Sequence, residues 1–151
     1  TPAIYVDAAR KVLGKIDLDP ASSPKAQKIV MAEVYHTVDD DGLKQKWRGK
    51  VWLNPPYGGL ADKFIEKLHS EFNAGNVSAA IVLVNAHCTD TLWFKPLWDG
   101  LLCFTDHRIN FDGDKKRSGS THGSIFVYFG KYKDKFIKNF RQFGPIVRRI
   151  K

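Results

Sequence analysis

The stretch that most constrains this chain is the apolar run from Lys50 to Leu53, which ends abruptly in Asn54-Pro55-Pro56-Tyr57. Each proline fixes its own φ, lacks an amide donor and forces the residue before it out of the helical region. Asn54 and Pro55 are therefore held extended after a predicted strand. In an open α/β sheet, this position points the Asn54 side-chain carbonyl and a main-chain carbonyl into the crevice where ligands bind.

Two carbonyl oxygens that converge on one point suit a planar amino group, because such a group offers two N–H donors. Accepting both donors would draw the nitrogen towards tetrahedral geometry and free its lone pair for attack. Tyr57 adds a flat face on which a base lifted out of a duplex can stack. A plain strand-ending turn is the alternative, since Pro-Pro is common after strands.

Length and composition fit one globular domain over residues 1–151. The chain has 151 residues, of which 43% are hydrophobic and 13% aromatic, and such a chain can bury one core of reasonable size. No stretch approaches the ~18 apolar residues of a membrane span. The first residues also lack a basic-then-apolar secretory pattern, so we expect no membrane association and a cytoplasmic location.

The formal net charge of +8 and the isoelectric point near 9.5 indicate a polyanionic partner. A soluble protein with lysines spread over its helix surfaces would have the same charge. The distribution favours a partner, because Lys115-Lys116-Arg117 lies in a Gly/Ser-rich stretch that can approach a phosphate backbone closely. Arg148, Arg149 and Lys151 form a second basic group at the end of the sequence.

Cysteine and histidine spacings do not predict a metal site. Cys88 and Cys103 lie in apolar surroundings without a second pair, so neither a disulfide framework nor a zinc site is expected. The five histidines are scattered along the chain, and we expect each on the surface or in the core. A reducing cytosol fits this usage best.

Hydrophobic periodicity predicts alternating helices and strands. Thr1 and Ser23 are expected N-caps, each followed by a proline, and Gly14 is the expected residue after the first helix. We expect helices over 2–13, 24–30, 60–72, 90–98 and 132–143, and strands over 15–19, 34–36, 50–53, 78–84, 101–104, 125–129 and 146–150.

This alternation predicts an α/β three-layer sandwich with a mostly parallel sheet and helices on both faces. The strands at 101–104 and 125–129 are joined by one loop, so an antiparallel hairpin is expected at one edge. The first strand ends in Asp17-Leu18-Asp19-Pro20-Ala21. A carboxylate there can accept from an ammonium group or from ribose hydroxyls, although Asp-Pro alone is also a common turn starter.

The ordered set of motifs resembles the adenine-N6 DNA methyltransferases, and most closely the small phage and prophage DNA N-6-adenine methyltransferases of the Dam type. The resemblance extends over nearly the whole chain. The residues that carry it are Thr1-Pro2, Gly14, Ile16 to Ser22, Asp41-Gly42-Leu43, Trp47, Val51 to Gly58, Arg108-Ile109, Phe111, Gly123-Ser124 and Gly130.

The resemblance implies a Rossmann-like methyltransferase sandwich that uses S-adenosylmethionine to methylate the N6 amino group of adenine in DNA. The base would be flipped into the pocket formed by Asn54, Pro55, Pro56 and Tyr57, which are the implied catalytic residues. The implied cofactor-binding residues are Thr1, Pro2, Asp17, Asp19, Pro20, Ala21, Ser22 and Asp41. The expected DNA-binding residues are Arg108, Lys115, Lys116, Arg117 and His122.

Within that set, the resemblance gives three residues a specific role. Asp19 would hold the methionine ammonium group, Thr1 would meet the methionine carboxylate and Asp41 would accept from the cofactor's adenine amino group. Many methyltransferases have a glycine-rich turn after the first strand, and Pro20 to Ser23 takes its place here. Phe111 is a candidate second stacking partner for the base, with a place in the hairpin core as its alternative.

We expect a monomer or weak homodimer, without a metal, in a bacterial or phage-infected cell. Only the loop at 112–123 is available to recognise sequence, so a separate target-recognition domain is not expected and the sequence preference should be short or weak. Three other functions stay open. They are methylation of adenine in RNA, methylation of a protein glutamine amide, and DNA binding without catalysis on the same scaffold.

Overall fold

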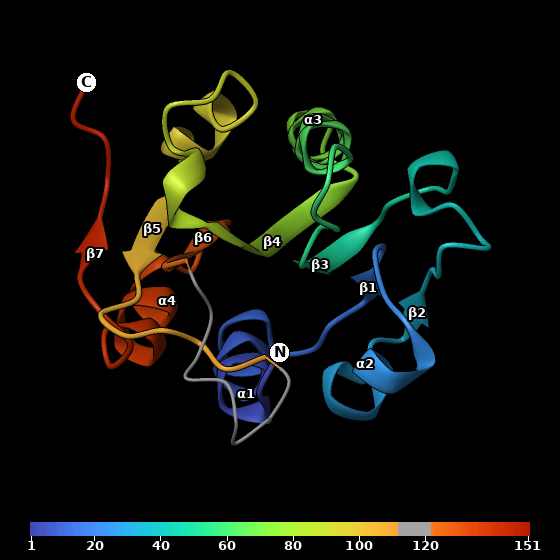
Figure 1. The fold of residues 1–151 in the computed structure, drawn as a ribbon, viewed down its shortest axis with the longest axis horizontal. Helices are drawn as coiled ribbons and strands as arrows, with labels where there is room; N and C mark the ends of the chain where they lie inside the picture. Colours follow the sequence, from blue (N-terminus) through green and yellow to red (C-terminus); the bar gives the residue numbers. More distant parts are fainter. Residues whose placement is uncertain (112–121) are drawn as a thin grey trace.

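The computed structural model describes residues 1–111 and 122–151. Within them, one sheet runs through the centre of the molecule, with its seven strands in the order β2-β1-β3-β4-β6-β5-β7 (Figure 1). The strands are β1 (Leu18–Asp19), β2 (Val34–Tyr35), β3 (Gly49–Leu53), β4 (Val77–Asn85), β5 (Leu101–Phe104), β6 (Ser124–Phe129) and β7 (Ile146–Val147).

The predicted topology is confirmed. Strands β1 to β4 pair in parallel, with Val51 of β3 opposite Ala80 of β4. Strand β6 pairs antiparallel with both β4 and β5, so the second strand of the hairpin lies inside the sheet and the first lies beyond it. The short strand β7 then pairs antiparallel with β5 as the outermost strand.

Four α-helices flank the sheet within the described residues. They are α1 (Ala3–Leu13), α2 (Pro24–Val30), α3 (Ala61–Asn73) and α4 (Lys133–Phe140). Helix α3 covers one face of the sheet, and α1 and α4 cover the other (Figure 1). The Ser23 hydroxyl accepts from Ala26 N at 3.1 Å, so the predicted N-cap of α2 is confirmed. None of these described helices is long and apolar enough to cross a membrane.

Two local predictions are wrong. Helix α1 starts at Ala3 with Pro2 at the N-cap position, so Thr1 does not cap it. No α-helix forms over 90–98, where the chain makes turns and a short 3₁₀ helix over Lys95–Asp99. Pro96 lacks an amide donor and restricts the residue before it, and the local bonds span three residues, as in Leu97 N to Phe94 O at 2.8 Å.

Both faces of the sheet are buried. In β4, Ile81 and Leu83 pack with α1 and α4 on one face, while Ala80, Val82 and Val84 pack with α3 on the other, all at most 2% exposed. Side chains alternate along a strand, so a run without polar residues requires cover on both sides. This arrangement confirms the predicted three-layer sandwich and fixes the strand ends that carry the site.

Candidate active site

The predicted site residues meet at the carboxyl ends of β1 and β3. These strands are neighbours, with Leu18 opposite Val51. Asp19 at the end of β1 and Asn54 just after β3 therefore lie close together at the same edge of the sheet. A cavity of about 690 Å³ opens there, which we call the Asp19 cavity. It is lined by the predicted residues Thr1, Pro2, Asp19, Ala21, Asn54 and Tyr57 and, among others, by Ser23, Trp52, Asn110 and Phe111.

One end of the Asn54 side-chain amide has a hydrogen-bond partner among the described residues, and the other end has none. Its Nδ2 donates to the Thr1 hydroxyl at 3.2 Å. Its Oδ1 is buried and has no hydrogen-bond partner among the described residues. A buried acceptor without a donor costs about 1–3 kcal/mol, so Asn54 Oδ1 is prepared to receive an N–H group from a ligand.

Thr1 therefore contacts the loop from Asn54 to Tyr57 directly. Sequence reasoning placed its hydroxyl at the helix start, but the helix begins two residues later and leaves the hydroxyl beside Asn54. Because the Thr1 oxygen accepts from Nδ2, it fixes which end of the Asn54 amide faces the rest of the cavity. Thr1 and Pro2 both line the Asp19 cavity.

Asp19 is a buried carboxylate, with only 2% of the residue exposed. Burial raises the pKa of Asp19 to about 6, although hydrogen bonds from Ser22, Ala21 and Gln27 favour the charged form. Gln27 Nε2 donates to Asp19 Oδ2 at 3.0 Å, and Ala21 N approaches Oδ1 at 3.4 Å. At neutral pH the group is mostly ionised, and a cationic ligand would stabilise that charge.

Gln27 is a functional residue that sequence reasoning missed. It also donates to the Ser22 hydroxyl at 2.8 Å, and its Oε1 accepts from Ala32 N at 2.8 Å. These bonds hold the amide in one orientation against Asp19. The available signal was its position in the first turn of α2, since Ser23 is the N-cap and Gln27 lies one turn further on.

A second cavity, of about 410 Å³, lies against the catalytic loop and is called the Trp93 cavity. Pro55, Tyr57, Asn85 and Trp93 line it, so Tyr57 borders both cavities. Tyr57 is 57% exposed, and its ring is accessible to a base. Trp93 is half-buried.

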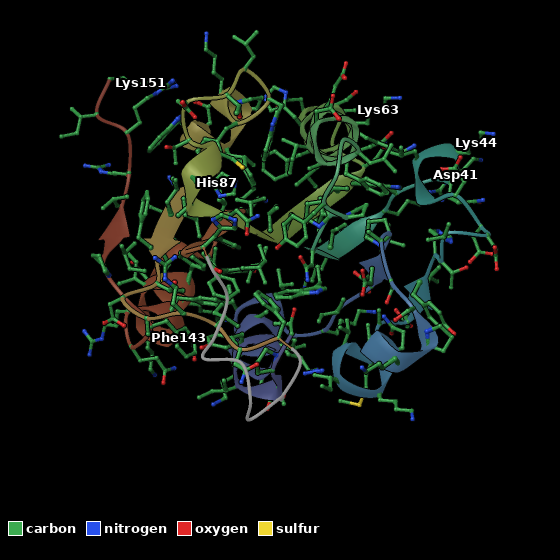
Figure 2. All side chains as sticks on the ribbon, in the orientation of Figure 1. Asp41, Lys44, Lys63, His87, Phe143 and Lys151 are labelled. Carbon is green, nitrogen blue, oxygen red and sulfur yellow. The ribbon has the colours of Figure 1, made fainter. Side chains whose placement is uncertain are left out.

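Two predicted cofactor residues lie away from the Asp19 cavity. Asp17 accepts from Lys50 N at 2.8 Å and pairs with Lys15 at 3.1 Å. Partial burial favours its neutral form, but these donors outweigh it and hold the pKa of Asp17 below its ordinary value. Asp41 accepts from Leu43 N at 3.2 Å and lies at the outer edge of the molecule (Figure 2).

Pro20 and Ser22, two more predicted cofactor residues, are not among the residues that line the Asp19 cavity, but they contact residues around it. The Pro20 carbonyl packs so closely on Gly42 that a side chain there would collide with it. The Ser22 hydroxyl accepts from Gln27 and supports the Asp19 network. The segment from Pro20 to Ser23, which stands in place of a glycine-rich turn, therefore helps to hold Asp19 in position.

Of the predicted DNA-binding residues, Arg108 and His122 lie together. They line a cavity of about 660 Å³ with His87 and His107, and the rings of His87 and His122 are 4.2 Å apart between centroids. Asp106 lines the same cavity, and His87 also borders the Trp93 cavity, so the two cavities adjoin each other. Lys115, Lys116 and Arg117 lie outside the described residues.

The segment that carries Phe111 is tied to α1. Tyr5 Oη lies 2.6 Å from His107 Nε2, and His107 Nδ1 lies 2.8 Å from Asp106 Oδ1. Burial and the Asp106 carboxylate raise the pKa of Tyr5. Phe111 is partly buried against the core and also lines the Asp19 cavity, so stacking on a base stays a prediction for it.

The residues that the structure describes contain no group of three or more His, Cys, Asp or Glu side chains arranged to hold a metal. Cys88 and Cys103 are both free thiols. Burial and the Asp106 carboxylate raise the pKa of Cys103 to about 12. This thiol packs in the core and is protonated at neutral pH.

Comparisons with known proteins bear on the fold and the family of the chain. A solved structure of the 23S rRNA methyltransferase ErmE superposes with a TM-score of 0.51 at 9% sequence identity, over 85% of this chain and 67% of that chain. This likeness shows a shared methyltransferase fold. Among curated protein sequences, none matches. The family model for DNA N-6-adenine-methyltransferase (Dam) matches residues 1–144. The chain therefore belongs to the DNA N-6-adenine-methyltransferase (Dam) family.

Proposed function

We propose that the chain methylates the N6 amino group of adenine in DNA with S-adenosylmethionine as methyl donor. The observation that carries this proposal is Asn54 Oδ1, a buried acceptor without a partner among the described residues, at the wall of the Asp19 cavity. A ligand N–H group would satisfy it. Membership of the family supports adenine as the source of that group.

The residues of the Asp19 cavity fit S-adenosylmethionine. Asp19 is buried, oriented by Gln27 and mostly ionised at neutral pH, so it can accept from the methionine ammonium group. Thr1 and Pro2 line the same cavity of about 690 Å³. When bound, the cofactor supplies an electrophilic methyl group.

Asn54 would accept from N6 of adenine through Oδ1, with the Pro55 carbonyl as the second acceptor. Both oxygens would stabilise positive charge on N6. Since that nitrogen becomes a stronger acid as it gains charge, no strong base is required at the site. Thr1 would keep the amide of Asn54 in this orientation, because its hydroxyl accepts from Nδ2 at 3.2 Å.

Tyr57 would stack on the extrahelical base, replacing part of the stacking that the base loses in the duplex. Its exposed ring borders both cavities beside Asn54. Arg108 and His122, next to His87, would contact the phosphates that flank the target. The net charge of +8 supports a nucleic-acid substrate over a protein glutamine.

The test is incubation with labelled S-adenosylmethionine and a panel of duplex DNA, single-stranded DNA, RNA and glutamine-containing peptide, followed by nucleoside and amino-acid analysis. The expected result is N6-methyladenine from DNA. Label in RNA or in the peptide, with none in DNA, would overturn the proposal. Tight DNA binding without any transfer would favour a non-catalytic binding module.

A further inference from the structure

A basic groove of about 620 Å³ lies at the end of the sheet opposite Asn54, and we call it the C-terminal groove. Gly100 and Leu101 at the start of β5 and Phe129 and Gly130 at the end of β6 form part of its wall. Because β6 runs antiparallel to β4 and β5, these residues share the end of the sheet where β4 begins. The groove is therefore separate from the Asp19 cavity.

Four cationic side chains and one carboxylate line the C-terminal groove. The cations are Lys133, Arg148, Arg149 and Lys151, and the carboxylate is Asp99. Asp99 Oδ1 pairs with Arg149 at 2.9 Å and also lies 3.6 Å from Lys151. Within the described residues, no carboxylate forms an ion pair with Lys133 or Arg148. The groove therefore has a surplus of positive charge that favours an anion.

Aromatic side chains also line the groove. Phe72 and Phe129 pack with ring centroids 5.5 Å apart, and Trp98, which is half-buried, adds a third ring. A groove lined by both cationic and aromatic side chains suits a sugar–phosphate chain, because arginine and lysine contact phosphates while aromatic rings contact sugars or bases. A small inorganic anion would not use the aromatic side chains.

The basic tail that completes this groove lies outside the family match. That match covers residues 1–144, whereas Arg148, Arg149 and Lys151 follow it. The tail is held against the sheet by β7, whose Val147 pairs with Leu102 of β5. Lys133 and the aromatic residues of the groove lie within the matched residues, so the groove combines part of the matched chain with the basic tail that follows it.

From these observations we propose that the C-terminal groove binds the phosphodiester backbone of DNA at a second site, away from the adenine pocket. This rests on the proposed function only in taking DNA as the polyanion. Contact at both ends of the sheet retains a long duplex, or a second segment of it, between successive turnovers. A short duplex that fills only the catalytic end does not use the groove.

The test variant is Lys133→Glu combined with Arg148→Glu, because both side chains lack an ion-pair partner among the described residues and their exchange leaves the Asp99 contacts in place. The matched control is Lys46→Glu combined with Lys63→Glu, two exposed lysines with the same charge change. Figure 2 shows Lys63 well apart from Lys151. Circular dichroism and thermal unfolding verify that both variants fold.

Binding is measured by fluorescence anisotropy with a long duplex lacking adenine targets, over a series of salt concentrations. We expect the groove variant to bind about tenfold more weakly, with a log–log salt slope that is smaller by about 1 for each phosphate that the variant no longer touches. The control should weaken much less. Equal affinity and equal slope in the two variants would overturn the proposal.

Methylation separates this proposal from the proposed function. On a short duplex with one target, the groove variant should turn over at the wild-type rate, while on a long duplex it should release DNA more often between methylations. If wild-type protein methylates nothing, the proposed function fails, but the anisotropy result still decides whether the groove binds DNA. Equal retention of long DNA by variant and wild type would also contradict the groove's role.

Discussion

Asn54 and Thr1 lie 53 positions apart in the sequence, yet one hydrogen bond between them decides how the Asn54 amide faces the cavity. An asparagine amide presents an acceptor and a donor at nearly the same distance, so its orientation needs a fixed partner. The Thr1 hydroxyl is that partner, and it leaves Oδ1 to the ligand. The same residue also lines the predicted cofactor cavity.

Replacing Thr1 with valine tests this positioning role. Thr1→Val removes the acceptor for Nδ2 and lets the amide turn, so we expect kcat to fall about tenfold, equivalent to about 1.4 kcal/mol. The dissociation constant for S-adenosylmethionine, measured by calorimetry, should change less. Thr1→Ser keeps the hydroxyl and should restore turnover. Normal kcat with weakened cofactor binding would show that Thr1 serves the cofactor carboxylate and not Asn54.

The pKa of Asp19 gives a prediction for stability against pH. It is raised from the ordinary 3.8 to about 6 by burial, so the folded chain binds this proton more tightly than the unfolded chain. The resulting stability is fully present below about pH 4 and is lost as the pH rises through 6. Asp19→Asn should therefore raise the free energy of unfolding at pH 8 by up to about 3 kcal/mol, measured by urea denaturation.

The same Asp19→Asn variant should lose affinity for S-adenosylmethionine, because the carboxylate that receives the ammonium group is gone. Asp17→Asn is the matched control, since the pKa of Asp17 is lowered by its donors and its charge stabilises the fold. That control should be less stable at neutral pH. If Asp19→Asn is also less stable, or binds the cofactor normally, the role given to Asp19 is wrong.

At the scale of elements, the start of α2 and the end of α1 were predictable from local signals. Ser23 caps α2, and Gly14, with φ 83°, follows α1 and donates to Arg10 O. The structure of the segment over 90–98 was not predictable in this way, because aromatic residues at helical spacing also suit a turn that packs against α3. Pro96 was the signal that an α-helix would not propagate there.

The candidate site was predictable where one strand end carried a whole motif, as at Asp19 and Asn54. The parallel order β1-β3 then made their proximity a consequence of the topology. Gln27 offered only its position near the start of α2 as a signal and Asn110 offered none, because their place depends on how α2 and the segment after β5 pack over the sheet edge. Asp17 and Asp41 show that an acidic residue near a motif can accept a hydrogen bond from a main-chain N–H group, a contact that the motif itself does not predict.

The contact between α1 and the segment after β5 gives a prediction for Tyr5. Tyr5→Phe removes the hydroxyl 2.6 Å from His107 Nε2 but keeps the ring, which packs on Phe143 at 4.8 Å between centroids. We expect a loss of about 1 kcal/mol in the free energy of unfolding, and a higher KM for DNA because Phe111 is held less firmly. Unchanged stability and KM would mean that this contact does not position the segment.

For the whole molecule, the sheet separates two surfaces that could meet a nucleic acid. One is the cavity lined by Arg108, His87 and His122 together with Asp106, at the end of the sheet that carries the candidate site, and the other is the C-terminal groove. Burial of both faces of the sheet gives these surfaces a rigid support, since residues such as Val82 and Leu83 are fully buried.

The net charge of +8 predicts how affinity depends on salt. The logarithm of the binding constant for DNA should fall linearly with the logarithm of salt concentration, by about 0.9 for each phosphate contacted. Affinity for S-adenosylmethionine, whose charged groups meet buried partners, should change far less over the same range. Parallel anisotropy and calorimetry titrations give both slopes. DNA binding that does not vary with salt would contradict a phosphate-based interface.

The most direct test of the account is methylation by Asn54→Ala. The protein is incubated with labelled S-adenosylmethionine and duplex DNA, and N6-methyladenine is measured after nucleoside digestion, with calorimetry of cofactor binding on the same sample. Asn73→Ala, an exposed position at the end of α3, is the matched control. We predict that Asn54→Ala loses at least about a hundredfold in turnover while its cofactor affinity stays near wild type. Turnover equal to that of Asn73→Ala would contradict the account.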